Sequence, residues 1–341
     1  MSAVTVAITT YNLKQYLKQC FDDLAAQTFR DFDILVYDDC STDGTREQLA
    51  QFQEQLGNKL RLQLGETPLR MPAKARNALL NSEINGKYVV FLDGDDRIKP
   101  SFLEHLYTAA EAGQADVAVC AYDRFEDESG HVLCQEMRGW PEEIVLGEQI
   151  DRSPAFINTA LWNKLIRTDL IDDLRMPECT VGEDASFLLA LYLRSKKIVC
   201  IDEILIHYRV RAASVISNTP EETIYAFAGA LQNLWNCASG CMRNHIALAA
   251  FIHIGLSMSM RAYDNPRIDR KKVMSWIRSW FAETFNWFRG NSCFRLSYLL
   301  RHGVKGLGLW GSLWFYRCNC FSLFLWAVNT AKKVFHVDFK F

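Results

Sequence analysis

The chain has 341 residues, of which 49% are hydrophobic and 23% are charged. This composition is that of a globular protein with a buried core, and it excludes a disordered or fibrous chain. The net charge of −2 gives no indication of a nucleic-acid partner, but residues 267–341 carry 13 Lys and Arg against 3 Asp and Glu. An acidic body is therefore followed by a basic C-terminal region.

The first 122 residues alternate between strand and helix patterns. Short apolar runs rich in β-branched residues predict buried strands at 4–9, 33–37, 60–64, 88–92 and 116–122. Amphipathic segments between them predict helices at 14–27, 45–56, 72–82 and 100–112. This alternation predicts an α/β fold with a doubly wound, mainly parallel sheet that has helices on both faces. Turn signals at 123–155 predict a hairpin or loop, and 221–262 reads as mostly helical.

The C-terminal region is aromatic as well as basic, with six of the nine tryptophans after residue 270. In the predicted helix 273–288, one face collects Val273, Ile277, Trp280, Phe281 and Phe288. Lys271, Lys272, Arg278 and Arg289 lie beside that face, an arrangement typical of a helix in a membrane interface. The alternative is a helical cap that packs on the main domain. The charge-free stretches 306–316 and 318–331 are each shorter than the roughly 20 residues that span a bilayer.

Polar clusters follow three of the predicted strands: TTYN at 9–12, DDCSTDGT at 38–45 and DGDD at 93–96. Ligands of an open parallel sheet bind beyond the carboxyl ends of its strands, so the three clusters are expected to converge on one cleft. Several carboxylates in one cleft indicate a hard divalent cation that can also bridge phosphates. Taken singly, each cluster is equally compatible with a solvated turn or a helix cap. The chain has no Walker loop, so metal and arginines would hold a phosphate ligand.

Together these motifs resemble family 2 glycosyltransferases with the GT-A fold, of the bacterial surface polysaccharide or oligosaccharide type. The matching stretches are AITTYN at 7–12, VYDDCSTDGT at 36–45, KARN at 74–77, FLDGDD at 91–96, NKLIR at 163–167, GEDASF at 182–187 and HYRVRAASV at 207–215. The resemblance implies a GT-A catalytic domain at 1–217, with a nucleotide-sugar half at about 1–122 and an acceptor half at about 123–217. It leaves 218–341 as a separate helical region with aromatic and basic amphipathic helices.

The resemblance also implies which residues bind the donor: Thr10, Tyr11, Asp39, Arg76, Asp93, Arg209 and Arg211. Thr10 and Tyr11 would line the base pocket, and Asp39 would accept a hydrogen bond from uracil N3–H, which implies a UDP-linked sugar. Arg76 would contact the nucleotide or its phosphates. Arg209 and Arg211 lie in a segment that would close over the diphosphate.

The remaining roles concern the metal and the general base. Asp93 and Asp95 match the DXD motif of the family, so they are the implied ligands of Mn²⁺ or Mg²⁺, with Asp93 also reaching the ribose. Asp96 is an additional acid with no assigned role. Asp184 is the implied general base, and Glu183 is the alternative, although both residues could instead cap the following helix.

The resemblance therefore implies an inverting, metal-dependent enzyme that moves one sugar from a UDP-sugar to a hydroxyl of a glycan or lipid-diphosphate-linked acceptor. Alternatives are a sugar nucleotidyltransferase and an inactive, membrane-associated scaffold with the same fold. The expected location is cytoplasmic and peripheral on the inner face of the membrane. It rests on the basic C-terminal helices, on scattered cysteines without metal spacing, and on a first segment unlike a signal peptide.

Overall fold

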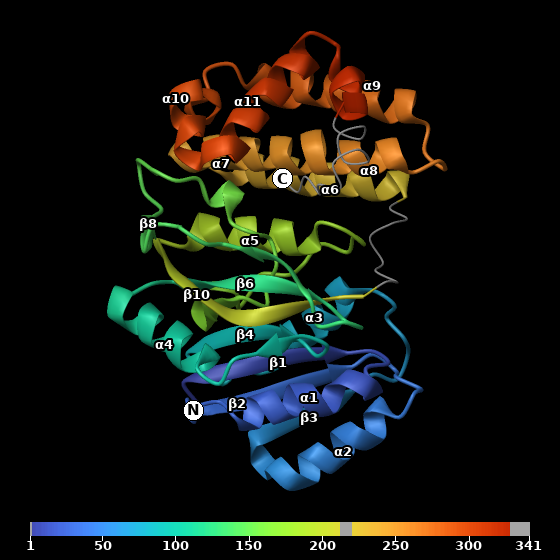
Figure 1. Ribbon diagram of the computed structural model, residues 1–341, viewed down its shortest axis with the longest axis vertical. Helices are drawn as coiled ribbons and strands as arrows, with labels where there is room; N and C mark the ends of the chain where they lie inside the picture. Colours follow the sequence, from blue (N-terminus) through green and yellow to red (C-terminus); the bar gives the residue numbers. More distant parts are fainter. Residues whose placement is uncertain (1, 212–219, 328–341) are drawn as a thin grey trace. The chain divides into compact units, whose positions relative to one another are not determined.

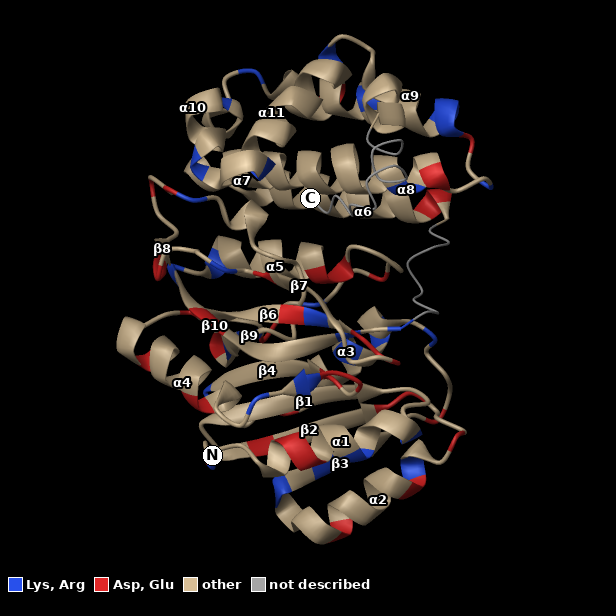
Figure 2. Ribbon diagram, in the orientation of Figure 1, with Lys and Arg blue, Asp and Glu red and all other residues tan. Residues whose placement is uncertain are grey.

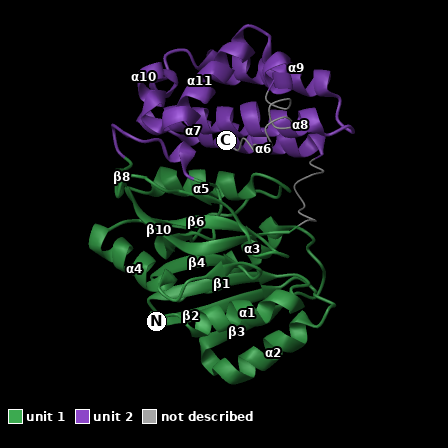
Figure 3. Ribbon diagram, viewed as in Figure 1, with its two compact units in different colours: residues 1–146, 158–214 green, residues 147–157, 215–341 purple. Residues whose placement is uncertain are grey.

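The computed structural model describes residues 2–211 and 220–327 (Figure 1). Two compact units divide the chain, as Figure 3 shows: residues 1–146 with 158–214 form unit 1, and residues 147–157 with 215–341 form unit 2. The domain boundary expected between 217 and 218 falls in the stretch 212–219, outside the described residues, as does the end of the HYRVRAASV motif. The short segment 147–157 belongs to unit 2, although it lies within the expected acceptor half.

Unit 1 contains one ten-stranded sheet. Its strands are β1 (Val4–Thr10), β2 (Phe32–Asp38), β3 (Leu60–Leu64), β4 (Tyr88–Asp93), β5 (Arg97–Ile98), β6 (Val117–Glu126), β7 (Val132–Glu136), β8 (Glu143–Val145), β9 (Lys164–Arg167) and β10 (Lys197–Val210). The main path runs β3-β2-β1-β4-β9-β6-β10-β5, with β7 beside β6 and β8 beside β10. The four parallel pairings, β1 with β2 and β4, β2 with β3, and β6 with β10, are the longest ones, so the sheet is mainly parallel as expected.

The central strands are buried on both faces. Every residue of β4 except its last, Asp93, is buried, and the same holds for all of β1 except Thr9. Alternating exposure would be expected if one face met water, so helices must cover both sides. The helices of unit 1 are α1 (Lys14–Ala25), α2 (Thr45–Leu56), α3 (Pro72–Leu80), α4 (Phe102–Gly113) and α5 (Glu183–Arg194). The predicted α/β class is confirmed.

Four strands were not anticipated from the sequence: β5, β8, β9 and β10. The first three are two to four residues long, too short to show a clear period. The 14-residue strand β10 carries His207 and Arg209 near its carboxyl end, beside β6. The expected hairpin after β6 is present, because β7 pairs antiparallel with it.

The described part of unit 2 is helical, with four long helices and several short ones. Its main helices are α6 (Glu221–Cys237), a continuous helix from α7 (Gly240–Ala250) through the π-helical Phe251–Met258 to α8 (Ser259–Asp264), α9 (Arg270–Phe285), α10 (Leu296–Leu299) and α11 (Gly303–Arg317). Among the described residues, the helix Gly240–Asp264 alone is long and apolar enough to cross a membrane. Since 72% of its most apolar window is buried, it equally meets the description of a core helix.

The aromatic face expected to meet a membrane lies instead inside unit 2. Val273, Ile277 and Phe281 are fully buried, and Phe288 and Trp280 are 3% and 7% exposed. Their rings pack on Phe251 and its neighbours, for example at 5.5 Å between the centroids of Phe251 and Phe281. The assignment of this face to a membrane interface is therefore wrong, because helical periodicity marks a buried face without identifying what buries it.

Candidate active site

The strand register brings the predicted polar clusters to one edge of the sheet. Thr10 at the end of β1 lies opposite Asp38 at the end of β2, and Thr9 lies opposite Asp93 at the end of β4. All three strands are parallel, so their carboxyl ends meet at the same edge. The expected convergence of TTYN, DDCSTDGT and DGDD is confirmed.

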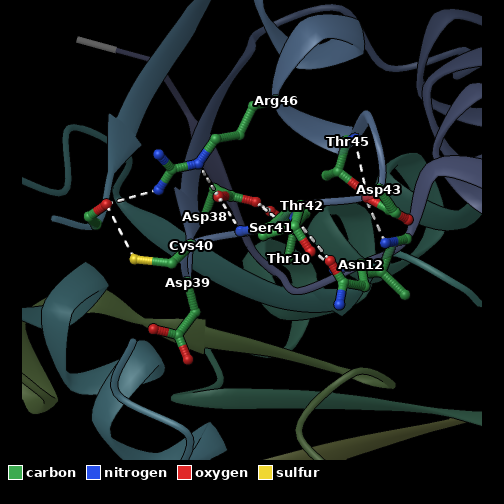
Figure 4. A network of polar contacts seen from close by, with 12 residues as sticks. Thr10, Asn12, Asp38, Asp39, Cys40, Ser41, Thr42, Asp43, Thr45 and Arg46 are labelled. Atoms are coloured by element: carbon green, nitrogen blue, oxygen red, sulfur yellow. Dashed lines mark hydrogen bonds and ion pairs between the residues drawn. The ribbon is translucent and has the colours of Figure 1, made fainter. Parts of the chain in front are cut away.

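Asp38 forms hydrogen bonds within the protein (Figure 4). Its carboxylate is fully buried and accepts hydrogen bonds from Thr10 Oγ1 at 3.0 Å, Ser41 N at 2.9 Å and Arg46 Nε at 2.7 Å. These donors stabilise the buried charge. Asp38 therefore fixes the loop after β2, and Thr10 is held by the same network.

Asp39 points away from that network in Figure 4. Its carboxylate is 6% exposed and accepts from the backbone N–H groups of Leu69 at 2.6 Å and Arg70 at 3.0 Å. A carboxylate offers about four acceptor positions, so two donors leave capacity for another. Tyr11, which follows Thr10, is 57% exposed, an unusual state for a tyrosine at the end of a buried strand. Asp39 can therefore accept a further hydrogen bond from a ligand, and the Tyr11 ring is accessible for stacking.

Arg76 joins the two acidic motifs of the site. It lies in α3, is 8% exposed, and its guanidinium is 3.1 Å from Asp93 Oδ1 and 2.9 Å from Asp184 Oδ1. Glu183 Oε1 is a further 3.8 Å partner. One buried cation therefore faces three carboxylates 17 to 108 positions away in sequence. The sequence assigned Arg76 to the nucleotide; its link between DGDD and the Glu183–Asp184 pair was missed, because nothing in the spacing reports it.

Asp184 has an acidity suited to proton transfer near neutral pH. It lies in the first turn of α5, which Gly182 precedes with a φ of 88° that favours glycine. Burial raises the pKa of Asp184 to about 7, and the nearby Glu183 and Asp93 add to the increase while Arg76 opposes it. A carboxyl group with this pKa can accept a proton at physiological pH and release it again.

The pKa values of Asp95 and Asp96 are also raised. Burial raises the pKa of Asp95, with a contribution from Asp93, while Arg211 opposes it through an ion pair of 2.8 Å to Asp95 Oδ2. Asp96 is 3% exposed; its Oδ1 accepts from Arg209 N at 2.8 Å, and its Oδ2 has no hydrogen-bond partner among the described residues. Burial and the two neighbouring carboxylates raise the pKa of Asp96 well above its usual value.

The Arg209 side chain is engaged by the protein. Its guanidinium donates to Asp95 O at 2.6 Å, to Asp127 Oδ1 at 2.6 Å and to Gln19 Oε1 at 2.9 Å, and it lies 4.8 Å from the Tyr16 ring centroid. Because each of its three side-chain nitrogens donates a hydrogen bond, Arg209 braces the end of β10 against α1 and the DGDD turn. Arg211, which is 46% exposed, is the more accessible of the two arginines.

His207 adds a polar group that the sequence left without a definite role. Its Nδ1 lies 2.7 Å from Oδ1 of the buried Asp123, the residue opposite it in β6. A carboxylate only accepts, so Nδ1 carries a proton and donates to Asp123. Within the described parts of the chain, no three His, Cys, Asp or Glu side chains are grouped so as to hold a metal ion.

Comparison with known proteins adds the family. Residues 5–170 match the family described as "Glycosyl transferase family 2". The chain belongs to this family. The glycosyltransferase GlyA of Streptococcus pneumoniae is 30% identical over 236 residues, 67% of this chain and 33% of GlyA. The poly(ribitol-phosphate) beta-N-acetylglucosaminyltransferase TarS of Staphylococcus aureus is 30% identical over 220 residues, 62% of this chain and 36% of TarS. This family 2 chain therefore spans about a third of the length of either relative.

Solved structures share the fold of this family 2 chain. Residues 1–349 of S. aureus TarS in complex with UDP-GlcNAc match with a TM-score of 0.67 and 20% identity, over 98% of this chain and 92% of that one. The mannosyltransferase PcManGT of Pyrobaculum calidifontis, in complex with GDP-Man and Mn²⁺, matches with a TM-score of 0.54 and 15% identity, over 98% and 87%. At these identities the likeness concerns the architecture alone.

Proposed function

We propose that unit 1 is an inverting glycosyltransferase that moves one sugar from a UDP-sugar to a hydroxyl of a glycan or lipid-linked acceptor. The observation that carries this proposal is the arrangement around Arg76. That guanidinium joins Asp93 of the donor motif to Asp184, a carboxyl group with a pKa of about 7. Arg76 therefore links the expected donor-binding motif to the expected general base, at the carboxyl edge of the sheet in a family 2 chain.

The nucleotide would lie across the ends of β1 and β2. The exposed Tyr11 ring can stack on a base, and Asp39 can accept the uracil N3–H with the capacity that Leu69 and Arg70 leave free. A structure of TarS contains UDP-GlcNAc, in line with a UDP-linked donor here. Arg211, at the exposed end of β10, is the arginine that we assign to the diphosphate.

We further propose that Asp95, with Asp93, holds Mn²⁺ or Mg²⁺. Ions that bind nucleotide diphosphates take one or two protein carboxylates and complete their shell with phosphate and water. Asp95 and Asp93 would supply these carboxylates, and the neighbour PcManGT was solved with Mn²⁺. The cation would offset the negative charge that grows on the departing diphosphate.

Asp184 would remove the proton from the acceptor hydroxyl as that oxygen attacks the anomeric carbon. The new C–O bond forms while the bond to the UDP oxygen breaks, and the electron pair leaves with UDP. Displacement of this kind in a single step inverts the anomeric carbon. Arg76 keeps part of the Asp184 population ionised at neutral pH, because its charge opposes the effect of burial.

The relatives support our proposals for the acceptor and the location. TarS is named for transfer to poly(ribitol-phosphate), so an acceptor of bacterial surface polysaccharide or oligosaccharide synthesis is the class we propose. The basic C-terminal region supports a location at the inner face of the membrane, whose lipids carry negative charge. We accordingly place this chain in the cytoplasm, attached peripherally to that face through unit 2.

The test is a panel of nucleotide-sugars with Mn²⁺, read as UDP release and as UDP binding by calorimetry. Wild type is expected to turn over at least one UDP-sugar, and Asp95→Asn to lose about 10²-fold or more of that activity. The matched variant Asp169→Asn changes an exposed carboxylate of unit 1 and should behave as wild type. Absence of both UDP binding and UDP release would overturn the proposal; nucleoside triphosphate formation from pyrophosphate would favour a nucleotidyltransferase instead.

A further inference from the structure

Unit 2 presents an exposed surface that is apolar and aromatic. It lies on α11 and on the helical segment 321–327 that follows. Its members, with their exposed fractions, are Val304 (88%), Leu307 (49%), Trp314 (48%), Phe315 (37%), Leu323 (58%) and Trp326 (57%). We call these residues the α11 face. Exposed apolar residues that are gathered on one surface mark an interaction site, whereas single exposed apolar residues do not.

The helical geometry of α11 gathers most of this face on one side. At 100° per residue, Val304, Leu307, Gly311, Trp314 and Phe315 fall within an arc of about 100°. The opposite side is buried in unit 2 and consists of Gly306, Leu309, Ser312, Leu313 and Tyr316. The helix is therefore apolar on two sides, of which the core of unit 2 uses only one.

The segment that carries the α11 face is strongly basic, although one of its arginines, Arg301, pairs with the exposed Asp151 of unit 2 at 3.0 Å. Residues 284–327 contain no Asp or Glu, and they contain Arg289, Arg295, Arg301, Lys305 and Arg317. All five are exposed, and Figure 2 shows the ribbon of α10 and α11 in tan and blue only. Arg317 lies beside the Trp314 ring, 5.9 Å from its centroid. An aromatic surface with a mainly basic border is complementary to an apolar layer beneath a layer of negative charge.

We propose that the α11 face docks on the surface of a bilayer that contains anionic phospholipid. The two tryptophans and Phe315 would enter the headgroup region, where aromatic side chains concentrate, while the arginines and Lys305 would meet lipid phosphates. A second copy of this chain is the less suitable occupant. In a twofold dimer the same basic border would face itself, and like charges would oppose contact.

This inference identifies the α11 face as the surface that would make the peripheral attachment proposed above. It rests on the proposed function only for the biological role of that attachment. The exposed α11 face takes the membrane-binding role that the sequence pattern predicts for the buried face of α9. The attachment would be interfacial, because α11 has 15 residues, fewer than the roughly 20 needed to span a bilayer.

The experiment is flotation of the full chain with vesicles of phosphatidylcholine, with and without phosphatidylglycerol. Wild type is expected to float with the anionic vesicles, and Leu307→Gln/Trp314→Gln to partition about tenfold less. The control is Val132→Gln/Leu133→Gln, which removes two apolar side chains of similar exposure (45% and 52%) from unit 1. Lys305→Glu should weaken binding to the anionic vesicles alone.

The possible outcomes separate the alternatives. Equal flotation of wild type and the α11 variant overturns the proposal, and so does a wild type that floats with neither vesicle. A change of native mass by light scattering in the α11 variant, without a change in flotation, would assign the face to a second copy. UDP release measured without vesicles is expected to be the same in both proteins. If no protein releases UDP but flotation still depends on Leu307 and Trp314, the proposed function fails and this inference stands.

Discussion

The carboxyl edge of the unit 1 sheet and the α11 face of unit 2 both contain side chains in energetically unfavourable surroundings, for opposite reasons. At the sheet edge, acids crowd together, and Arg76 stabilises them at 3.1 Å from Asp93 and 2.9 Å from Asp184. On α11, apolar side chains remain exposed, up to 88% for Val304. The comparison teaches that each unit keeps a surface suited to a ligand: burial raises the pKa of Asp184 to about 7 at the sheet edge, and the apolar side chains of the α11 face remain exposed.

The largest expected effect is at the sheet edge. Asp184→Asn keeps the size of the side chain but removes the proton acceptor, so acceptor-dependent transfer should fall by about 10³-fold. UDP-sugar binding, measured by calorimetry, should be retained. Glu183→Gln is the matched control in the same turn of α5. Transfer at full rate by Asp184→Asn would exclude this residue as the base, and loss of transfer in Glu183→Gln would favour the alternative.

The second prediction contrasts the two apolar faces of unit 2. Phe281→Ala removes a fully buried ring, so the free energy of unfolding should fall by about 3–5 kcal/mol. Trp314→Ala removes a ring that is 48% exposed, and the change should stay near 0.5 kcal/mol. Urea denaturation followed by circular dichroism measures both. Similar losses for the two variants would mean that α11 is packed on both sides and would remove the basis of the α11 face.

The third prediction is a shift in pH dependence. Burial raises the pKa of Asp184 to about 7, and only the ionised form can accept a proton, so kcat should rise between about pH 6 and 8. Arg76→Gln removes the cation that opposes this increase, so the rising limb should move to higher pH by about one unit. Arg194→Gln, at the exposed end of α5, should leave the limb in place.

The same titration predicts a trend in stability. A carboxyl group whose pKa is raised on folding favours the unfolded state once it ionises, so the free energy of unfolding should fall as pH rises through about 7. In Arg76→Gln the fall should extend to higher pH, because the folded-state pKa of Asp184 is raised further. If Arg76→Gln leaves the rising limb of the kcat profile at the same pH, Arg76 does not act on Asp184.

The smallest expected effect concerns the nucleotide base. Tyr11→Ala should raise KM for the UDP-sugar about fivefold, the loss of one stacking contact. Because Tyr11 is 57% exposed, the variant should fold normally. Tyr11→Phe keeps the ring and should retain the wild-type KM. If both variants behave as wild type, the base does not lie on Tyr11.

The candidate site was largely predictable because its residues lie in short, contiguous motifs at strand ends. Thr10 and Asp93 end strands with a clear apolar pattern, Asp39 and Asp95 come just after such strands, and parallel strands end at one edge. The contacts that tune the site were not predictable. Arg76 meets Asp184 across 108 positions, and the guanidinium of Arg209 binds Asp127, Gln19 and the Asp95 carbonyl, because such contacts depend on the packing of separate elements.

The sequence by itself determined the α/β class, the order of the first strands and helices, and the acidic motifs, because local periodicity and strand-end chemistry are written in neighbouring residues. Only the tertiary structure decided which apolar helix faces are buried. Val273, Phe281 and Trp314 all belong to aromatic, basic helices with the same pattern, yet the first two are fully buried and the third is exposed. Periodicity defines a face, whereas long-range packing decides whether protein covers it.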